Sequence, residues 1–234
     1  PAALKRAIEG RIDGGDVRLE DFPQGSFSDV TAVHLVACGT SYHAGLYGQR
    51  LLADWGVPCR TVLASEYAVS PPPVPEGTLV VGVTQSGETA DTLEALEVAA
   101  ARGARTLALT NVVASSAARA CDDALFIRAG PEIGVAATKT FSSQVATLVL
   151  LASRIGADAG GTRPADQSER LHALAELPSA VRTVLDAGVA SDVARAYSDS
   201  DSHFFVGYAC AHPVSLEGAL KFKEITYEHA EGFA

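Results

Sequence analysis

Short, uninterrupted runs of hydrophobic residues recur along the chain from residue 31 onward, and helix-type patterns separate them. Five of these runs are predicted to be strands: 32–37, 60–64, 78–83, 105–109 and 124–128. Helical patterns lie at 42–55, 90–102, 115–120 and 138–155. Strands this apolar are buried on both faces, as parallel strands covered by helices are. The pattern therefore predicts an α/β fold, a three-layer α/β/α doubly wound sandwich around a five-stranded parallel sheet.

The rest of the chain divides around this sheet. Residues 1–24 are expected to be a helical lead-in, and residues 25–155 to form a first subdomain. Residues 156–202 are interpreted as a linker with helices around 169–187 and 189–197, because 156–168 is rich in Gly, Asp and Ala and includes Pro164. A strand at 203–207 and a helix at 214–228 then repeat the opening pattern. Because a lone βα unit cannot bury its own apolar face, we interpret 203–234 as the truncated start of a second subdomain.

Composition and charge limit the classes of function. The 234 residues are 47% hydrophobic and 20% charged, which is typical of a globular protein. A formal net charge of −10 argues against a nucleic-acid or anionic-membrane partner, which would require a basic patch. No apolar run reaches the ~18 residues of a membrane span, and no signal peptide opens the chain. The chain begins with proline and contains no methionine, so we expect it to be part of a longer protein.

Four cysteines are scattered widely along the chain: Cys38, Cys59, Cys121 and Cys210. None forms a C-x-x-C pair, and no cysteine–histidine cluster has metal-ligand spacing. We therefore expect reduced thiols in a cytoplasmic protein, with no metal ion and no cofactor.

The most informative motif is Thr-Gln-Ser-Gly-Glu-Thr at residues 84–89, which ends a predicted strand and opens a helix. The free N–H groups of a first helical turn, together with the helix dipole, favour an anion at such a point. Thr84, Gln85, Ser86 and Thr89 offer further hydrogen bonds, and none of these side chains is basic. That set suits a phosphate on a neutral polyol better than a nucleotide triphosphate with magnesium. The motif therefore predicts a sugar-phosphate pocket.

Two other strand ends carry candidate ligand loops. Thr40 and Ser41 offer hydroxyls at a helix start after the first strand. A third loop, 132–139, places small residues around Val135 after the last strand, where a ligand could approach the backbone. Taken alone, each loop is explained by an ordinary turn and helix cap. The loop of Thr40 and Ser41 and the motif at 84–89 are both rich in hydroxyls, and both lie at the carboxyl ends of strands in one parallel sheet. Together they favour a shared pocket.

The last predicted helix places Glu217, Lys221, Glu224 and Glu228 on one face, at spacings of four, three and four residues. One interpretation is a solvated face of Glu–Lys pairs, each worth ~0.3–0.5 kcal/mol. The other is a carboxylate base beside an ammonium, which can move a proton between neighbouring carbons of a sugar. The pattern does not choose between them.

These motifs resemble those of a known family. Residues 37–42, 64–67, 84–92 and 132–139 are similar to the sugar-isomerase (SIS) domain of glutamine–fructose-6-phosphate aminotransferases. Residues 216–231 (Leu-Glu-Gly-Ala-Leu-Lys-Phe-Lys-Glu-Ile-Thr-Tyr-Glu-His-Ala-Glu) resemble the start of the second subdomain in that family. The similarity covers nearly the whole chain, in order.

The resemblance implies a site and a reaction. Glu224 would be the base that shuttles a proton between C1 and C2, with Lys221 and Val135 nearby. The family converts fructose 6-phosphate and glutamine to glucosamine 6-phosphate and glutamate, and an N-terminal glutaminase domain supplies the ammonia. A homodimer is also implied. The phosphate and hydroxyl site would be lined by Thr40, Ser41, Thr84, Gln85, Ser86 and Thr89.

The sequence departs from the family pattern at two positions. Thr84 stands where the family usually has serine, so the hydroxyl is kept with an added methyl. Ala137 replaces a usual serine, so one contact to the sugar is expected to be lost. The glutaminase domain, a ring-opening histidine and a C-terminal lysine of the family are not among these residues. We therefore expect this stretch to bind better than it catalyses.

Two other functions stay open. A non-catalytic sugar-phosphate sensor needs the phosphate loops but has no use for Glu224 and Lys221. Such sensors usually carry a DNA-binding helical module, and no basic segment is visible here. A related phosphosugar isomerase or deglycase would use the same loops and the same Glu–Lys pair on another substrate.

Overall fold

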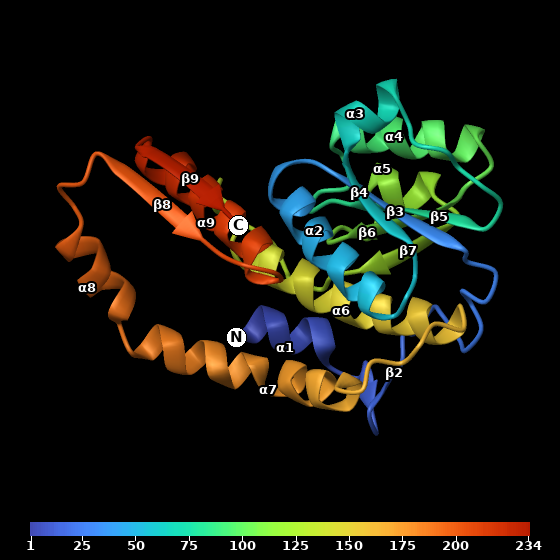
Figure 1. The fold of residues 1–234 in the computed structure, drawn as a ribbon, viewed down its shortest axis with the longest axis horizontal. Helices are drawn as coiled ribbons and strands as arrows, with labels where there is room; N and C mark the ends of the chain where they lie inside the picture. The colour runs from blue at the N-terminus through green and yellow to red at the C-terminus, as the bar shows by residue number, and fades with distance from the viewer.

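Five parallel strands form the central sheet of the computed structural model, which describes residues 1–234 (Figure 1). Their order in the sheet is β4-β3-β5-β6-β7, and every neighbouring pair is parallel. The doubly wound sheet predicted from the hydrophobic runs is confirmed. The strands are β3 (Ala32–Ala37), β4 (Cys59–Leu63), β5 (Thr78–Val83), β6 (Arg105–Thr110) and β7 (Asp123–Phe126).

Helices cover both faces of this sheet, so each strand contributes to two cores (Figure 1). On β3, Leu35 belongs to a cluster of 30 buried residues, whereas its neighbour Val36 belongs to a second cluster of ten. This alternation is what a strand buried on both sides requires. The larger cluster lies against α2 (Gly39–Asp54) and α6 (Lys139–Asp158). The smaller cluster lies against α3 (Ala64–Val69), α4 (Ala90–Ala101) and α5 (Ser116–Ala120).

The N-terminal segment is only partly helical. Helix α1 (Ala2–Ile8) packs on α6, and a short hairpin of β1 (Ile12–Asp13) and β2 (Asp16–Val17) follows it. The hairpin turn consists of two glycines with positive φ, Gly14 and Gly15. Of the helical lead-in expected over residues 1–24, the helix therefore covers the first third.

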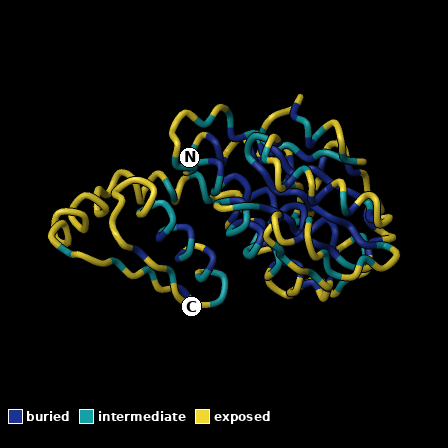
Figure 2. Tube along the Cα trace, turned by 90° about the horizontal axis from the view of Figure 1, so that it is seen from above, coloured by how far each residue is buried: buried dark blue, intermediate teal, exposed yellow.

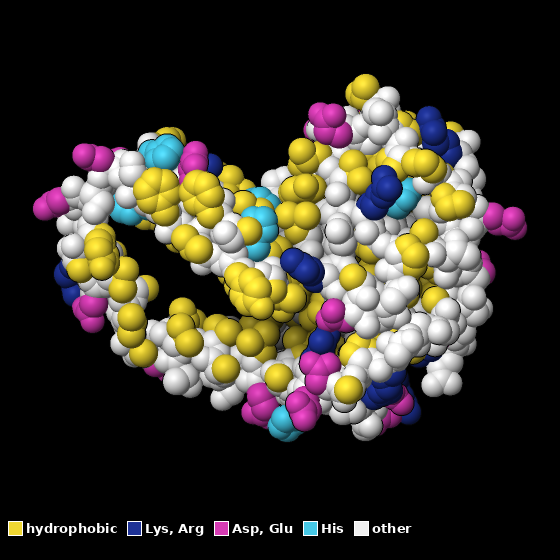
Figure 3. Space-filling model, in the orientation of Figure 1, with side chains coloured by type: hydrophobic (Ala, Val, Ile, Leu, Met, Phe, Trp, Pro, Cys, Tyr) yellow, Lys and Arg dark blue, Asp and Glu magenta, His cyan; other side chains and the backbone are white.

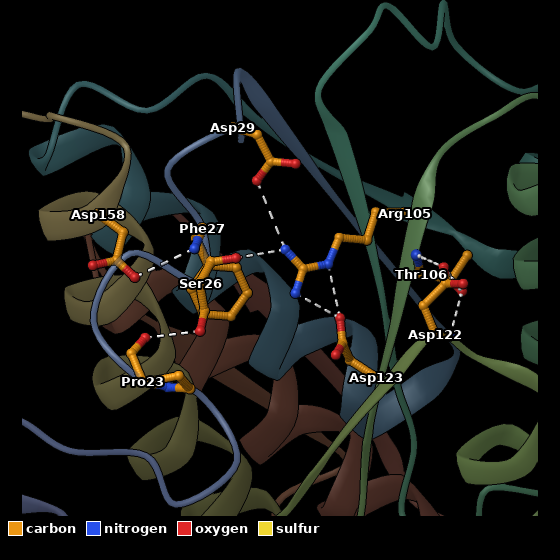
Figure 4. A network of polar contacts seen from close by, with 9 residues as sticks. All are labelled: Pro23, Ser26, Phe27, Asp29, Arg105, Thr106, Asp122, Asp123 and Asp158. Atoms are coloured by element: carbon orange, nitrogen blue, oxygen red, sulfur yellow. Dashed lines mark hydrogen bonds and ion pairs between the residues drawn. The ribbon is translucent and has the colours of Figure 1, made fainter.

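A polar network fastens the next part of this segment to the sheet (Figure 4). Arg105 on β6 donates from Nη1 to the Ser26 carbonyl at 2.6 Å and from Nε to Asp123 at 2.8 Å. The Asp158 carboxylate at the end of α6 accepts from the Phe27 amide at 3.3 Å. The Arg105 guanidinium also lies over the Phe27 ring. These contacts close the edge of the sheet that is opposite to the carboxyl ends of its strands.

Beyond the sheet, the chain forms a long helical arm and a small C-terminal unit (Figure 1). The arm is α7 (Gln167–Asp186) and α8 (Val189–Ala196), and the unit is β8 (Ser202–Val206), α9 (Ala211–Thr226) and β9 (His229–Phe233). Strands β8 and β9 are parallel, and α9 packs against α2 of the first unit. None of these helices, nor any other in the chain, is long and apolar enough to cross a membrane.

The C-terminal unit leaves much of its apolar surface exposed, unlike the dark-blue core of the first sheet (Figure 2). Phe204 on β8 is 61% exposed and Val206 is 75% exposed. Figure 3 shows hydrophobic side chains over this part of the surface. One helix cannot cover both faces of a two-stranded sheet, so apolar side chains of the strands stay exposed.

The predicted helix at 214–228 is wrong at its C-terminal end. Helix α9 stops at Thr226, because Tyr227 adopts a left-handed conformation with φ 62° and the chain turns into β9. Glu228 therefore lies outside the helix and does not share its face. Strand β9 was not predicted, and neither was α3.

Candidate functional site

The strand order reverses direction between β3 and β5, which makes this point the topological switch of the sheet. From β3 the chain first moves outward to β4, then crosses back to β5 on the other side. Ligands of doubly wound sheets bind in the crevice that this reversal opens at the carboxyl ends of the strands. Val36 is paired with Gly82 in register, so the loops that follow β3 and β5 leave the sheet side by side.

The loop after β5 (residues 84–89, the β5 loop) is curled by its own hydroxyls. The buried Oγ1 of Thr84 accepts a hydrogen bond from the Gly87 amide at 3.1 Å and lies 3.3 Å from Oγ1 of Thr89. Oγ of Ser86 accepts from the Glu88 amide at 3.1 Å, which leaves the hydroxyl proton of Ser86 uncommitted. The side chain of Gln85 makes no hydrogen bond within the chain.

The first turn of α4 has free backbone donors. Thr89 is the N-cap residue, but its side chain makes no capping hydrogen bond. The amides of Ala90, Asp91 and Thr92 have no acceptor within the chain. Unpaired amides at a helix N-terminus, aided by the helix dipole, favour an anion. Plain helix capping, the alternative interpretation of this motif, therefore does not describe Thr89.

Gly87 is required by the shape of the β5 loop. Its φ is +70°, and a Cβ atom at this position would lie 2.2 Å from Oγ of Ser115. The Gly87 carbonyl also accepts from the Ala117 amide at 3.0 Å, which joins the loop to α5. An added methyl group would therefore meet both a disfavoured backbone conformation and a steric clash.

Replacing Gly87 with alanine is expected to lower the free energy of unfolding by about 3 kcal/mol, from backbone strain and overpacking together. Gly103→Ala is the matched control, because Gly103 has φ +84° but no atom within 4 Å of the added Cβ. That variant should lose only the backbone part, about 1 kcal/mol. Urea denaturation of both variants measures the two free energies of unfolding. Equal losses of stability would show that the Ser115 side chain moves away from the added methyl group without an energetic penalty.

The loop after β3 (residues 38–41, the β3 loop) holds two hydroxyls in different states. Oγ of Ser41 accepts from Nε2 of Gln144 on α6 at 2.8 Å, so its own proton is available to a ligand. Oγ1 of Thr40 instead donates to a carboxylate oxygen of Glu217 at 2.9 Å. The amides of Gly39, Thr40 and Ser41 have no acceptor within the chain, which repeats the arrangement at α4. Ser41 is thus the better placed of the two hydroxyls to donate to an anion.

The thiol beside these loops is not a nucleophile. Burial raises the pKa of Cys38, and the neighbouring Asp91 carboxylate raises it further. Cys38 therefore stays protonated at neutral pH, and its sulfur lies 3.8 Å from Asp91 Oδ2.

Glu217 is the functional candidate that the sequence analysis missed. The sequence placed it on the shared polar face of the helix without giving it a role of its own, and in the structure it is only 4% exposed. One carboxylate oxygen accepts from Thr40, and the other lies 2.8 Å from Nδ1 of His43. Thr40 and His43 are three residues apart and so share a face of α2, a spacing that is visible in the sequence.

Lys221 lies between two carboxylates of α9. Its Nζ is 3.6 Å from Glu217 and 2.5 Å from Glu224. Lys221 is largely buried, whereas Glu224 is about one-third exposed on its side chain. The solvated-face interpretation is therefore wrong for Glu217 and Lys221. Glu224 keeps an open side toward solvent, as a base that meets a substrate must.

The structure does not join all predicted site residues. No hydrogen bond or ion pair links Glu224 or Lys221 to the β5 loop. Val135 is fully exposed in the loop between β7 and α6. No cluster of three or more His, Cys, Asp and Glu side chains has the arrangement of a metal site. Through Glu217, the structure brings Thr40 of the β3 loop together with the helix that carries Lys221 and Glu224.

Comparison with known proteins gives a consistent family. Residues 26–154 match the family model described as "SIS domain". The whole chain is 52% identical to part of the glutamine–fructose-6-phosphate aminotransferase [isomerizing] of Halobacterium salinarum, and 46% identical to part of the one from Symbiobacterium thermophilum. It spans 40% and 39% of the lengths of these two relatives.

A solved structure supports the same assignment. The C-terminal domain of glucosamine-fructose-6-phosphate aminotransferase from Francisella tularensis superimposes with a TM-score of 0.90 at 32% identity. The match covers 100% of this chain and 66% of that one. The family resemblance inferred from the motifs is confirmed.

Proposed function

The chain belongs to the SIS domain family, and on that premise we propose that it is the isomerase part of a glutamine–fructose-6-phosphate aminotransferase. In this proposal it binds a hexose 6-phosphate and helps convert fructose 6-phosphate and ammonia to glucosamine 6-phosphate. Within the full-length protein, a glutaminase domain supplies the ammonia and the assembly is a cytoplasmic homodimer. The observation that carries the proposal is the pair of loops with free hydroxyls and amides at the switch point of the sheet.

The phosphate is assigned to the β5 loop. The free amides of α4 and the uncommitted proton of Ser86 give several donors in one small region. Donors aimed at a doubly charged group form the strong, charge-assisted class of hydrogen bond. Gln85 and Thr89 are assigned as further hydrogen-bond partners of the phosphate. Thr84 instead stabilises the loop, because its buried Oγ1 accepts from the Gly87 amide. In this assignment Ser41 and the free amides of the β3 loop bind the hydroxyls of the sugar. Val135, in the loop between β7 and α6, lies next to the bound ligand.

The proton transfer is assigned to Glu224. Once ammonia has added at C2 of the open-chain ketose and water has left, a base removes a proton from C1 and returns it to C2. The proton of the C1 hydroxyl ends on the nitrogen, so that C2 carries the amine and C1 becomes the aldehyde carbon. A carboxylate beside an ammonium on a rigid helix meets this requirement. Glu224 and Lys221 are such a pair.

A non-catalytic sugar-phosphate sensor remains the second candidate function. The same loops would serve it, but it has no use for a lysine held between two carboxylates. Burying Glu217 and Lys221 costs desolvation free energy, and a binding protein would gain nothing from it. The arrangement on α9 therefore favours the enzyme.

The β5 loop assignment is tested by Ser86→Ala and Thr89→Val. Each is expected to weaken fructose 6-phosphate binding by ~1–2 kcal/mol, because each removes a hydroxyl assigned to the ligand. Stability should change little in Ser86→Ala, since the Glu88 amide that Ser86 accepts from is exposed. In Thr89→Val, Oγ1 of Thr84 loses the contact with Thr89 but keeps the hydrogen bond from the Gly87 amide, so the change should again be small. Titration calorimetry and melting temperature are measured on the same samples.

Ser153→Ala supplies the matched control. Oγ of Ser153 donates to the Val149 carbonyl and accepts from Gln167 in the buried interior, far along α6. That variant should lower the melting temperature and leave the affinity unchanged. If Ser86→Ala behaved in the same way as Ser153→Ala, the hydroxyl of Ser86 would be structural and the loop assignment would fail.

A further inference from the structure

We propose that Glu217 is a positioning residue, which holds Lys221 and the base-bearing helix α9 in register with the β3 loop. The proposal rests on the proposed function, because it concerns the alignment of Glu224 with a bound sugar. It assigns Glu217 no contact with substrate. The observation behind it is one buried carboxylate that accepts from the first subdomain with both oxygens and pairs with Lys221 in the second.

The contacts with the first subdomain fix the position of the carboxylate. Oε1 of Glu217 is 2.9 Å from Oγ1 of Thr40, and Oε2 is 2.8 Å from Nδ1 of His43. Both partners belong to the first two turns of α2, directly behind the β3 loop. A carboxylate buried to 4% exposure is stable only when it is hydrogen-bonded in this way. The two contacts therefore fix the rotation of α9 about its own axis and its position along α2.

The contact with the second subdomain orients the ammonium of Lys221. A lysine side chain is long and flexible, so a single partner leaves its charge free to move. Here Nζ is held from two sides, by Glu217 at 3.6 Å and Glu224 at 2.5 Å. The carboxylate of Glu224 is partly exposed and has no other charged partner. Its position consequently depends on Lys221, and through Lys221 on Glu217.

Such a chain of contacts acts on rate more than on affinity. The phosphate donors lie on the β5 loop, which shares no hydrogen bond or ion pair with Glu217, so binding of the phosphate group does not depend on it. Proton transfer between C1 and C2 does depend on the placement of the base within a fraction of an ångström. Loosening Glu217 should therefore lower kcat and leave KM for fructose 6-phosphate nearly unchanged.

The test is Glu217→Gln in the full-length protein that contains this chain. Glutamine keeps the size and one acceptor but removes the ion pair with Lys221. We expect kcat to fall at least ~10-fold while KM stays within ~3-fold. Glu228→Gln is the control, because it removes the same charge from an exposed carboxylate outside α9 and should leave both constants unchanged.

The outcomes separate the two claims. A wild-type protein that does not turn over fructose 6-phosphate would overturn the proposed function and the positioning role with it. Normal wild-type turnover with unchanged kcat in Glu217→Gln would overturn the positioning role alone. A fall in melting temperature without a fall in kcat would do the same, since it would make Glu217 a purely structural anchor.

A second variant covers the case in which Glu217→Gln does not fold. His43→Leu removes the Nδ1 contact from the α2 side and leaves every residue of α9 in place. The His43 side chain is 15% exposed, whereas that of Glu217 is 5% exposed, so the position of His43 tolerates this change more readily. We expect the same selective fall in kcat, at least ~3-fold. Unchanged kcat in this variant would contradict the proposal.

Discussion

Replacing Glu224 with glutamine in the full-length protein is expected to slow isomerisation at least ~10²-fold while phosphate-sugar affinity stays within a few-fold. Glutamine keeps the length and hydrogen-bonding capacity of the side chain but has no basic oxygen. The β5 loop shares no hydrogen bond or ion pair with Glu224, whose polar partner is Lys221, so phosphate binding should persist. The rate is measured as turnover, or as solvent deuterium incorporated into the bound sugar, beside the dissociation constant.

The same measurement decides what the Glu–Lys pair on α9 does. Lys221 stays paired with Glu217 in the variant, which limits the structural change to one side chain. Glu228→Gln again provides a variant with the same loss of charge outside the helix. Deuterium exchange at the wild-type rate in Glu224→Gln would mean that another group is the base and that Glu224 serves only as an ion-pair partner.

The sheet was predictable because its signal is local. The runs at 32–37 and 78–83 match β3 and β5 residue for residue, since each is mostly apolar and buried on both faces. A parallel strand in the centre of a sheet needs no alternation, so the run itself marks the element. The position of the polar loops at the carboxyl ends of these strands followed from the same pattern.

The elements that sequence missed depend on distant contacts. Strand β9 contains Glu231 and Gly232, and it exists because it pairs with β8 across the whole of α9. The end of α9 is set by one left-handed residue, Tyr227, which carries no glycine-like signal. The sequence prediction continued the helix past Tyr227 and therefore placed Glu228 on the same face as Glu217 and Glu224. In the structure Glu228 lies outside the helix.

Glu217 shows the same limit for the site. A helical pattern gives the spacing between charged residues but not the surface against which they lie. The solvated interpretation failed because α9 packs on α2, where Thr40 and His43 present two polar partners. A buried charge is compatible with this fold only because the partners are there, and they come from residues more than 170 positions away. No local property of 217–228 encodes that contact.

The second large effect is expected from the phosphate itself. The β5 loop offers hydroxyls and free amides but no basic side chain, so its hydrogen bonds depend on the charge of the ligand. Two charge-assisted bonds of ~1.5–3 kcal/mol each amount to at least ~10²-fold in affinity. Fructose, which lacks the phosphate, would have to rely on the β3 loop alone.

Titration calorimetry of this chain with fructose 6-phosphate, glucosamine 6-phosphate and free fructose therefore tests the central claim directly. The account predicts that both phosphates bind and that free fructose binds at least ~10²-fold more weakly. Ser86→Ala should lower the affinity for the two sugar phosphates but not that for fructose, so the difference in affinity should become smaller. Equal affinity for fructose and fructose 6-phosphate would contradict the assignment of the switch-point loops as a sugar-phosphate site.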